Sequence, residues 1–279
     1  MPVVATNTAA NTATRFLNYN TSMASSSVGK LASGSRIVRA SDDAAGLAIA
    51  ARLNSDVVAL QQASINASQG ASMVQVADGG LNRIGDVLQR MKALAAASLS
   101  GVPTDNERAF IDAEFQELVN EINGIADTTR FNGDSLLSGT TTNTAFFVGT
   151  DANDTISVNF TSLAGGTAGT TFGATALGIA SSVATAANAS SAMTQIDTAI
   201  DTISEARANA GAFISRFEFR GQQIATSTEN IQAAESAISD VDLAAEQAKL
   251  VSSQVLVQAS VSALSQANQI PQSLLRVLQ

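Results

Sequence analysis

The chain has 279 residues, of which 45% are hydrophobic and 14% are charged, and its formal net charge is -9. This acidic balance disfavours nucleic acid or an anionic membrane surface as the main partner. Because Cys and His are absent, a disulfide, a Cys/His zinc site and a Ser-His-Asp triad are excluded, and we expect no catalytic residues, metal or cofactor.

The first 40 residues carry a diluted apolar series with a seven-residue spacing: Ala10, Leu17, Ala24, Leu31 and Val38. A helix with so few large apolar residues is marginal alone, because packing supplies most helix stability. The first 16 residues also lack the basic and apolar regions of a cleavable secretory signal, so export would need another route.

A strict heptad pattern then predicts one helix from about residue 43 to residue 97, about 80 Å long at 1.5 Å per residue. Ser41, Asp42 and Asp43 are the expected N-terminal cap, and Gly101 to Pro103 end the helix. The first heptad position is apolar throughout and is occupied by Leu53, Leu60, Ala67, Val74, Leu81, Leu88 and Ala95.

A second helix is predicted directly afterwards, because Thr104 and Glu107 have the spacing of a capping box. Its apolar face has spacings of four and three and consists of Ile111, Phe115, Leu118, Ile122 and Ile125. This face predicts an amphipathic partner for the first long helix.

Between residues 139 and 190 the chain is rich in Gly, Thr and Ser, which is typical of loops and weak strands. One β-hairpin is predicted, with strands near 145–148 and 156–160 around a turn at 149–154. Asp151 and Asp154 could in principle serve a glycosidase or a calcium loop, but turn chemistry explains them without catalysis.

The heptad pattern returns near the C-terminus at Ile196, Ile203, Ala210, Phe217, Ile224, Ile231 and Ile238. A further series comprises Leu243, Leu250, Val257 and Leu264, and Pro271 is expected to end its helix. Both ends of the chain are nearly uncharged, which suits burial between copies, although they could instead pack on each other within a monomer.

The predicted fold is mainly α: an elongated antiparallel coiled-coil helical bundle with a small β-hairpin region, plus terminal helices that form a coiled-coil inner core. The expected divisions are 1–42 and 239–279 for the inner core, 43–140 and 191–238 for a helical rod, and 141–190 for a variable region. Neither long uncharged stretch, 155–196 or 250–275, is apolar enough to predict membrane insertion.

Four segments resemble bacterial flagellins. They are LASGSRIVRASDDAAGLAIAARL, QASINASQGASMVQVADGGLNRIGDVLQRMKALA and TTRFNGDSLL in the N-terminal half, and SALSQANQIPQSLLRVLQ at the end. The resemblance covers about residues 1–140 and 190–279. It implies an extracellular helical homopolymer, the flagellar filament, that serves motility.

The resemblance also implies export by a type III-like apparatus, and as partners an export chaperone, hook-associated proteins and a filament cap. Polymerisation through the inner core would involve Leu17, Leu31, Leu243, Leu250, Val257 and Leu264. Recognition by Toll-like receptor 5 would involve Gln89, Arg90, Leu94 and Glu114. The alternative is that these are ordinary solvated residues on the surface of the bundle.

Two other functions stay open at this point. A hook-filament junction protein would share the terminal heptads and the export route. A surface adhesin or polysaccharide-binding relative of flagellin would use the exposed 140–190 region, for which the sequence selects no ligand.

Overall fold

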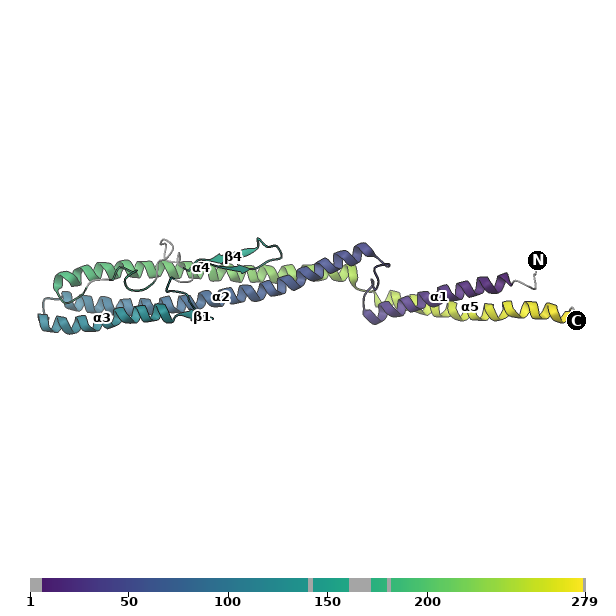
Figure 1. Cartoon of the computed structure of the whole chain (residues 1–279), viewed down its shortest axis with the longest axis horizontal. Coiled ribbons are helices and arrows are strands. Elements are labelled where there is room, and N and C mark those ends of the chain that lie inside the picture. The colour runs from purple at the N-terminus through teal and green to yellow at the C-terminus, as the bar shows by residue number, and fades with distance from the viewer. Residues whose placement is uncertain (1–6, 140–142, 161–171, 180–181, 278–279) are drawn as a thin grey trace. The chain divides into compact units, whose positions relative to one another are not determined.

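The computed structural model describes residues 7–139, 143–160, 172–179 and 182–277, and the side chains of the last helix as far as residue 269. The described residues form helices α1 (Thr8–Ser33), α2 (Ala44–Leu99), α3 (Asp105–Thr128), α4 (Ala186–Ser239) and α5 (Leu243–Val277). Two short antiparallel hairpins join α3 to α4 (Figure 1). The mainly α fold predicted from the heptads is therefore confirmed.

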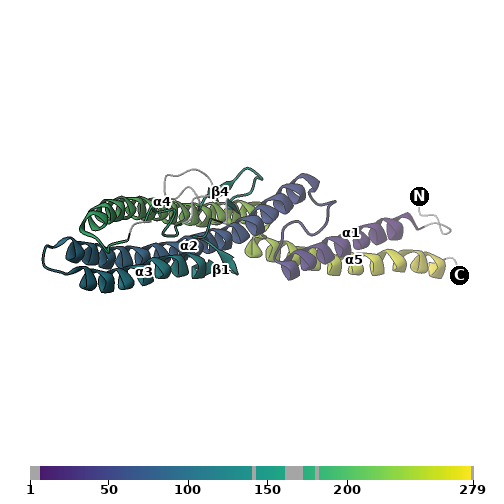
Figure 2. The same ribbon diagram turned by 60° about the vertical axis from the view of Figure 1, so that its left-hand side comes forward.

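The chain forms two compact units, one from residues 58–228 and the other from residues 1–57 together with 229–279. In the first unit α2, α3 and α4 lie side by side, as both views show (Figures 1 and 2). The heptad residues of α2 and α4 point inward there, and Leu81, Leu88 and Ile196 are fully buried. The predicted seams therefore form the core of this unit.

Close helix packing in this unit depends on Gly70. A Cβ atom at this position would lie 2.6 Å from the ring of Phe217, which is 1% exposed on α4. Phe146 of the hairpin meets the same ring edge to face, with 5.4 Å between centroids. The missing side chain thus makes room for the largest residue of the seam.

The predicted helix caps differ in detail. Asp43 accepts a hydrogen bond from the Gly46 N–H at 2.8 Å and caps α2, whereas Asp42 accepts from the N–H groups of Val38 and Arg39 in the preceding loop. Ser41 makes no cap bond at this helix in the described residues. Asp43 can act as the cap because its carboxylate lies three residues before the free N–H of Gly46 in the first turn of α2.

The start of α3 follows the predicted capping box. The Glu107 carboxylate accepts from the N–H of Thr104 at 2.7 Å and from its hydroxyl at 2.9 Å. These bonds, the backbone one first, lower the pKa of Glu107 below its ordinary value. The Arg108 guanidinium also donates to the carbonyl of Ser98 at 2.9 Å and so fixes the turn between α2 and α3.

The expected hairpin is present as β3 (Thr144–Phe147) and β4 (Thr155–Val158). Asp154 closes its turn, because its carboxylate accepts from the N–H groups of Thr150 and Asp151. The Asn66 side chain on α2 donates to the Phe147 carbonyl at 2.9 Å and holds the hairpin on the helices.

The prediction of only one hairpin was incomplete. Strands β1 (Arg130–Phe131) and β2 (Asp134–Ser135) pair around Asn132 and Gly133, whose φ angles are 52° and 95°. An Asn-Gly pair is the usual signal for this two-residue turn. The flanking strands have only two residues each, which hides them from a search for alternating strands.

In the other unit α1 and α5 lie side by side and run antiparallel (Figure 1). The chain segments that connect them to α2 and α4 are tied together, since the Arg36 N–H donates to the Ser239 carbonyl at 2.6 Å and the Val241 N–H to the Gly34 carbonyl at 3.1 Å. The Arg36 guanidinium also donates to the Ile238 carbonyl at the end of α4. This caps the carbonyl end of that helix.

The prediction that Pro271 ends the last helix was wrong, because α5 continues to Val277. A proline has no N–H, so its presence leaves the carbonyl of Ala267 without a helical donor. The Asn7 side chain fills that place, with its Nδ2 donating to the Ala267 oxygen at 2.9 Å. Asn7 also caps α1 by accepting from the Ala10 N–H at 3.0 Å.

Candidate assembly surface

The contact between α1 and α5 keeps heptad spacing but contains many polar residues. Asn20, Ser27 and Ser253 are all at least nine-tenths buried, as is Glu246. The Asn20 amide donates to the Ser260 hydroxyl at 3.1 Å, and the Ser27 hydroxyl donates to the Glu246 carboxylate at 2.7 Å. Polar pairs at such positions favour one register of two helices at some cost in stability.

Glu246 is the one acid in α5, and it is 6% exposed. The hydrogen bond from Ser27 is the largest influence on its carboxyl and lowers its pKa, and the nearby Lys249 and Lys30 act in the same direction. Burial opposes them. The carboxylate therefore stays charged inside the helix pair at neutral pH, because its charge is hydrogen-bonded and paired.

Large apolar side chains remain exposed on the outer faces of the same two helices. On α1 Phe16 is 54% exposed and Tyr19 is 61% exposed, and on α5 Val255 is 58% exposed. Because large exposed apolar patches mark sites of association, these side chains are candidates for one. Others on these helices are Met23, Val28, Val251, Leu256 and Val261.

An apolar groove of about 480 Å³ lies between α1 and α5. Phe16 and Tyr19 of α1 line one side, and Leu256 of α5 lines the other. Asn20 and Ser260, which are hydrogen-bonded to each other, also line it. The groove contains no charged residue, so it suits an apolar segment with small side chains.

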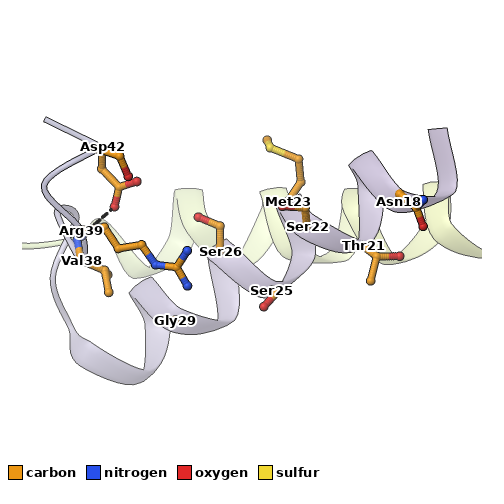
Figure 3. A pocket seen from close by; sticks show the side chains of 11 residues that line it. Asn18, Thr21, Ser22, Met23, Ser25, Ser26, Gly29, Val38, Arg39 and Asp42 are labelled. Carbon is orange, nitrogen blue, oxygen red and sulfur yellow. Dashed lines mark hydrogen bonds between the residues drawn. The ribbon is translucent and has the colours of Figure 1, made fainter. Parts of the chain in front are cut away.

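A second groove, of about 600 Å³, lies between α1 and the loop that follows it (Figure 3). Its α1 side carries the hydroxyls of Ser22, Ser25 and Ser26 and the bare backbone of Gly29. Figure 3 shows Arg39 extending from the loop along this face. Small residues and hydroxyls let another backbone approach closely.

The predicted polymerisation residues mostly lie in the seam between α1 and α5. Leu17, Leu31, Val257 and Leu264 are half-buried, and Leu250 is 9% exposed. Leu243 differs, because it is the first residue of α5 and is 61% exposed. The heptad series predicted from the sequence contains only apolar residues, so it did not include the buried polar residues Asn20, Ser27, Glu246 and Ser253.

The four predicted receptor residues do not share one surface. Arg90 on α2 and Glu114 on α3 are exposed and form an ion pair, with Nη2 to Oε1 at 2.6 Å. Gln89 lines a small groove of about 250 Å³ between α2 and α4. Leu94 is 7% exposed and packs in the core.

The aspartates of the β3–β4 turn have structural partners, as described above. Within the described ranges no three acidic side chains gather closely enough to hold a metal ion. Nor is any helix in those ranges both long and apolar enough to cross a membrane.

Comparison with known proteins assigns the family. Residues 4–142 match the bacterial flagellin N-terminal helical region, and residues 193–278 match the C-terminal helical region. A flagellin of Halalkalibacterium halodurans is 36% identical over 272 residues, which is 98% of each chain. The chain belongs to the flagellin family. The flagellar filament 30.7 kDa core protein of Treponema maltophilum is 33% identical and covers 95% of this chain and 96% of its own.

Solved structures agree with this assignment. A flagellin crystal structure from Bacillus cereus has a TM-score of 0.50 and 25% identity, and covers 61% of this chain and 94% of its own. A protein of Vibrio parahaemolyticus described as a flagellar hook-associated protein has a TM-score of 0.60. It is only 14% identical over 71% of this chain and all of its own, so it shows a shared fold alone. The near full-length relatives are filament proteins, and the junction alternative is not favoured.

Proposed function

We propose that this chain is the structural subunit of a flagellar filament and that the α1/α5 pair joins neighbouring copies. The observation that supports this most directly is the pair itself, whose seam is partly polar while large apolar side chains are exposed outside. A pair with this pattern gains most by burying its outer faces against further copies. Filament formation for motility follows from the family.

The proposed division of labour uses the limits predicted from the sequence. Residues 1–42 and 239–279 would form the inner core, residues 43–140 and 191–238 the rod, and residues 141–190 the variable β-hairpin and loop region. Within the core, Leu250 and its heptad neighbours join α1 to α5, and the exposed Leu243 is free to meet another copy.

Polymerisation of the purified full chain, followed by electron microscopy, tests this function. Leu256→Lys places a charge in the apolar groove and should prevent filament growth, while Val102→Lys adds the same charge at an 87% exposed loop position and should have no effect. Long filaments from the unaltered chain and none from Leu256→Lys are expected. Only short oligomers from the unaltered chain would contradict the proposal and favour a junction role.

As partners we propose an export chaperone, hook-associated proteins and a filament cap, with the filament outside the cell. These follow from the family and not from a particular contact in this chain. Co-purification of the chaperone with the full chain but not with a chain lacking α5 would support its proposed binding site. Equal recovery with both chains would contradict it.

Recognition by Toll-like receptor 5 is the second proposal, and it concerns Arg90 and Glu114 in particular. Both are exposed, and their charges could form charge-assisted hydrogen bonds with a receptor once their mutual pair opens. Gln89 would contribute from the groove between α2 and α4, and the buried Leu94 would act through packing. A reporter-cell assay should give a response to the unaltered chain that Arg90→Ala reduces, and no response to the unaltered chain would contradict the proposal.

A further inference from the structure

The α4 helix carries an unusual exposed face in the 58–228 unit. Phe219 is 71% exposed, and Arg216 and Arg220 flank it on the same side, at spacings of three and one. Exposed aromatic and arginine side chains together are the residues enriched at the centres of protein interfaces. A face of this kind on a solvent-exposed helix points to a partner.

Among the described residues, Arg216 and Arg220 lack the acidic partners that most basic residues of this unit have. Of the eight Lys and Arg residues in 58–228, five form ion pairs within the unit. Among the described residues, Arg216 makes only a cation–π contact with Phe213 at 5.5 Å, and Arg220 bonds the Gln223 amide at 3.3 Å. Their positive charge is therefore available to a carboxylate from outside.

The same unit offers a complementary face on α3. Phe110 is 77% exposed, and Glu117 and Glu121 follow it on one side of the helix at seven and eleven positions. Both glutamates are exposed, and neither forms an ion pair among the described residues. Glu117 and Glu121 have the same four-residue spacing as Arg216 and Arg220 and the opposite charge, so the two pairs are complementary.

The two faces cannot meet within one unit. Glu114 of α3 lies against Arg90 of α2, and Phe217 of α4 lies against Gly70 of α2. The distance along α2 from residue 90 to residue 70 therefore measures how far apart the two faces lie along the unit. That is about 30 Å along the helix. Glu117 and Glu121 follow Glu114 along α3 and so lie nearer to the level of Gly70. The separation along the helix axis between these glutamates and the two arginines is therefore roughly 25 Å.

We propose that Arg216 and Arg220 of one copy pair with Glu117 and Glu121 of a second copy, staggered along the rod by roughly 25 Å, and that the same contact covers Phe219. The inference rests on the proposed filament function and adds a specific contact outside the α1/α5 pair. Because the two surfaces differ, the contact is heterologous, and each added copy presents a fresh surface to the next. Such contacts build open helical polymers instead of closed dimers.

Charge reversal provides the test, with full-length chains and the critical concentration for polymerisation as the measurement. Arg216→Glu with Arg220→Glu, or Glu117→Arg with Glu121→Arg, should raise that concentration by about tenfold or more, since like charges then face each other. The chain with all four changes restores opposite charges and should return close to the unaltered value. Thermal unfolding of each monomer shows that the variants fold.

The matched control is Asp201→Arg with Glu205→Arg, which reverses two exposed acids with the same spacing on another part of α4. It should leave the critical concentration unchanged. Failure of the four-fold variant to recover, or normal polymerisation of both reversed pairs, would overturn the inference while the unaltered chain still formed filaments. A filament map with Phe219 against solvent or against another protein would also overturn it, whereas no filaments from the unaltered chain would refute the proposed function itself.

Discussion

The two units of this chain share the heptad spacing but have different types of residue at the heptad positions. In the 58–228 unit the seam positions hold Leu81, Leu88, Met91 and Phe217, all 0–1% exposed. In the α1/α5 pair the equivalent positions alternate between apolar residues and polar ones such as Asn20.

The difference lies in where the stabilising free energy comes from. Burial of large apolar side chains lets the first unit hold itself together, at about 25 cal/mol per Å² of apolar surface removed from water. Hydrogen bonds contribute less net stabilising free energy than apolar burial. Those between α1 and α5 therefore fix the register of the pair but stabilise it only weakly. In the proposed filament the pair would gain the rest of its stability by burying the exposed Phe16, Tyr19 and Leu256 against other copies.

The largest expected effect is the loss of the central aromatic residue of the first unit. Phe217→Ala should lower the free energy of unfolding by about 3–5 kcal/mol, because it removes a fully buried ring and leaves a cavity beside Gly70. Chemical denaturation of the monomer measures this. Phe219→Ala, two residues away but 71% exposed, should change it by no more than about 0.5 kcal/mol.

A smaller effect is expected from filling the space beside that ring. Gly70→Ala should destabilise the monomer by about 1–3 kcal/mol, since its Cβ would meet the Phe217 ring at 2.6 Å. Gly79→Ala is the matched control on the same helix, because nothing lies within 4 Å of its Cβ position. It should instead stabilise by up to about 1 kcal/mol, and equal effects at both sites would contradict the packing described here.

Acid should weaken the α1/α5 pair through Glu246. Its folded pKa lies below the ordinary value of 4.5, so its stabilising contribution is complete above that pH and is lost as the pH falls below it. Filaments should therefore dissociate on acidification, as followed by light scattering. Glu246→Gln keeps an acceptor for Ser27 but does not titrate, so its filaments should show a shallower pH dependence in this range; an unchanged profile would exclude Glu246 as the cause.

The smallest effect should follow from changes at Asn7. Asn7→Ala removes both the cap of α1 and the bond to the Ala267 carbonyl, which should cost about 1 kcal/mol. Asn7→Asp keeps the cap but loses the donor. Limited proteolysis of filaments should therefore rank the resistance of their ends as unaltered chain, then Asp, then Ala. Equal resistance of the two variants would mean that only the bond to the Ala267 carbonyl matters, and equal resistance of Asn7→Asp and the unaltered chain would mean that only the cap matters.

The helices of the first unit could be predicted from local sequence patterns. Apolar residues recur every seven positions from Leu53 to Ala95, and this period places them on one side of a helix whatever the partner. The turns were also local: Thr104 with Glu107, and the residues before Asp154, fold through contacts within a few positions. The resemblance to flagellins likewise rests on long contiguous segments of the sequence.

Features that depend on residues far apart in the chain could not be predicted from the sequence pattern. Pro271 does not end α5, because Asn7, 260 residues away from Ala267, supplies the missing donor. The polar seam of α1 and α5, the burial of Leu94 and the two separated charged faces of α3 and α4 likewise follow from which helices meet. A heptad shows that a helix has an inner side, but the partner on that side determines whether Ser27 meets water or Glu246.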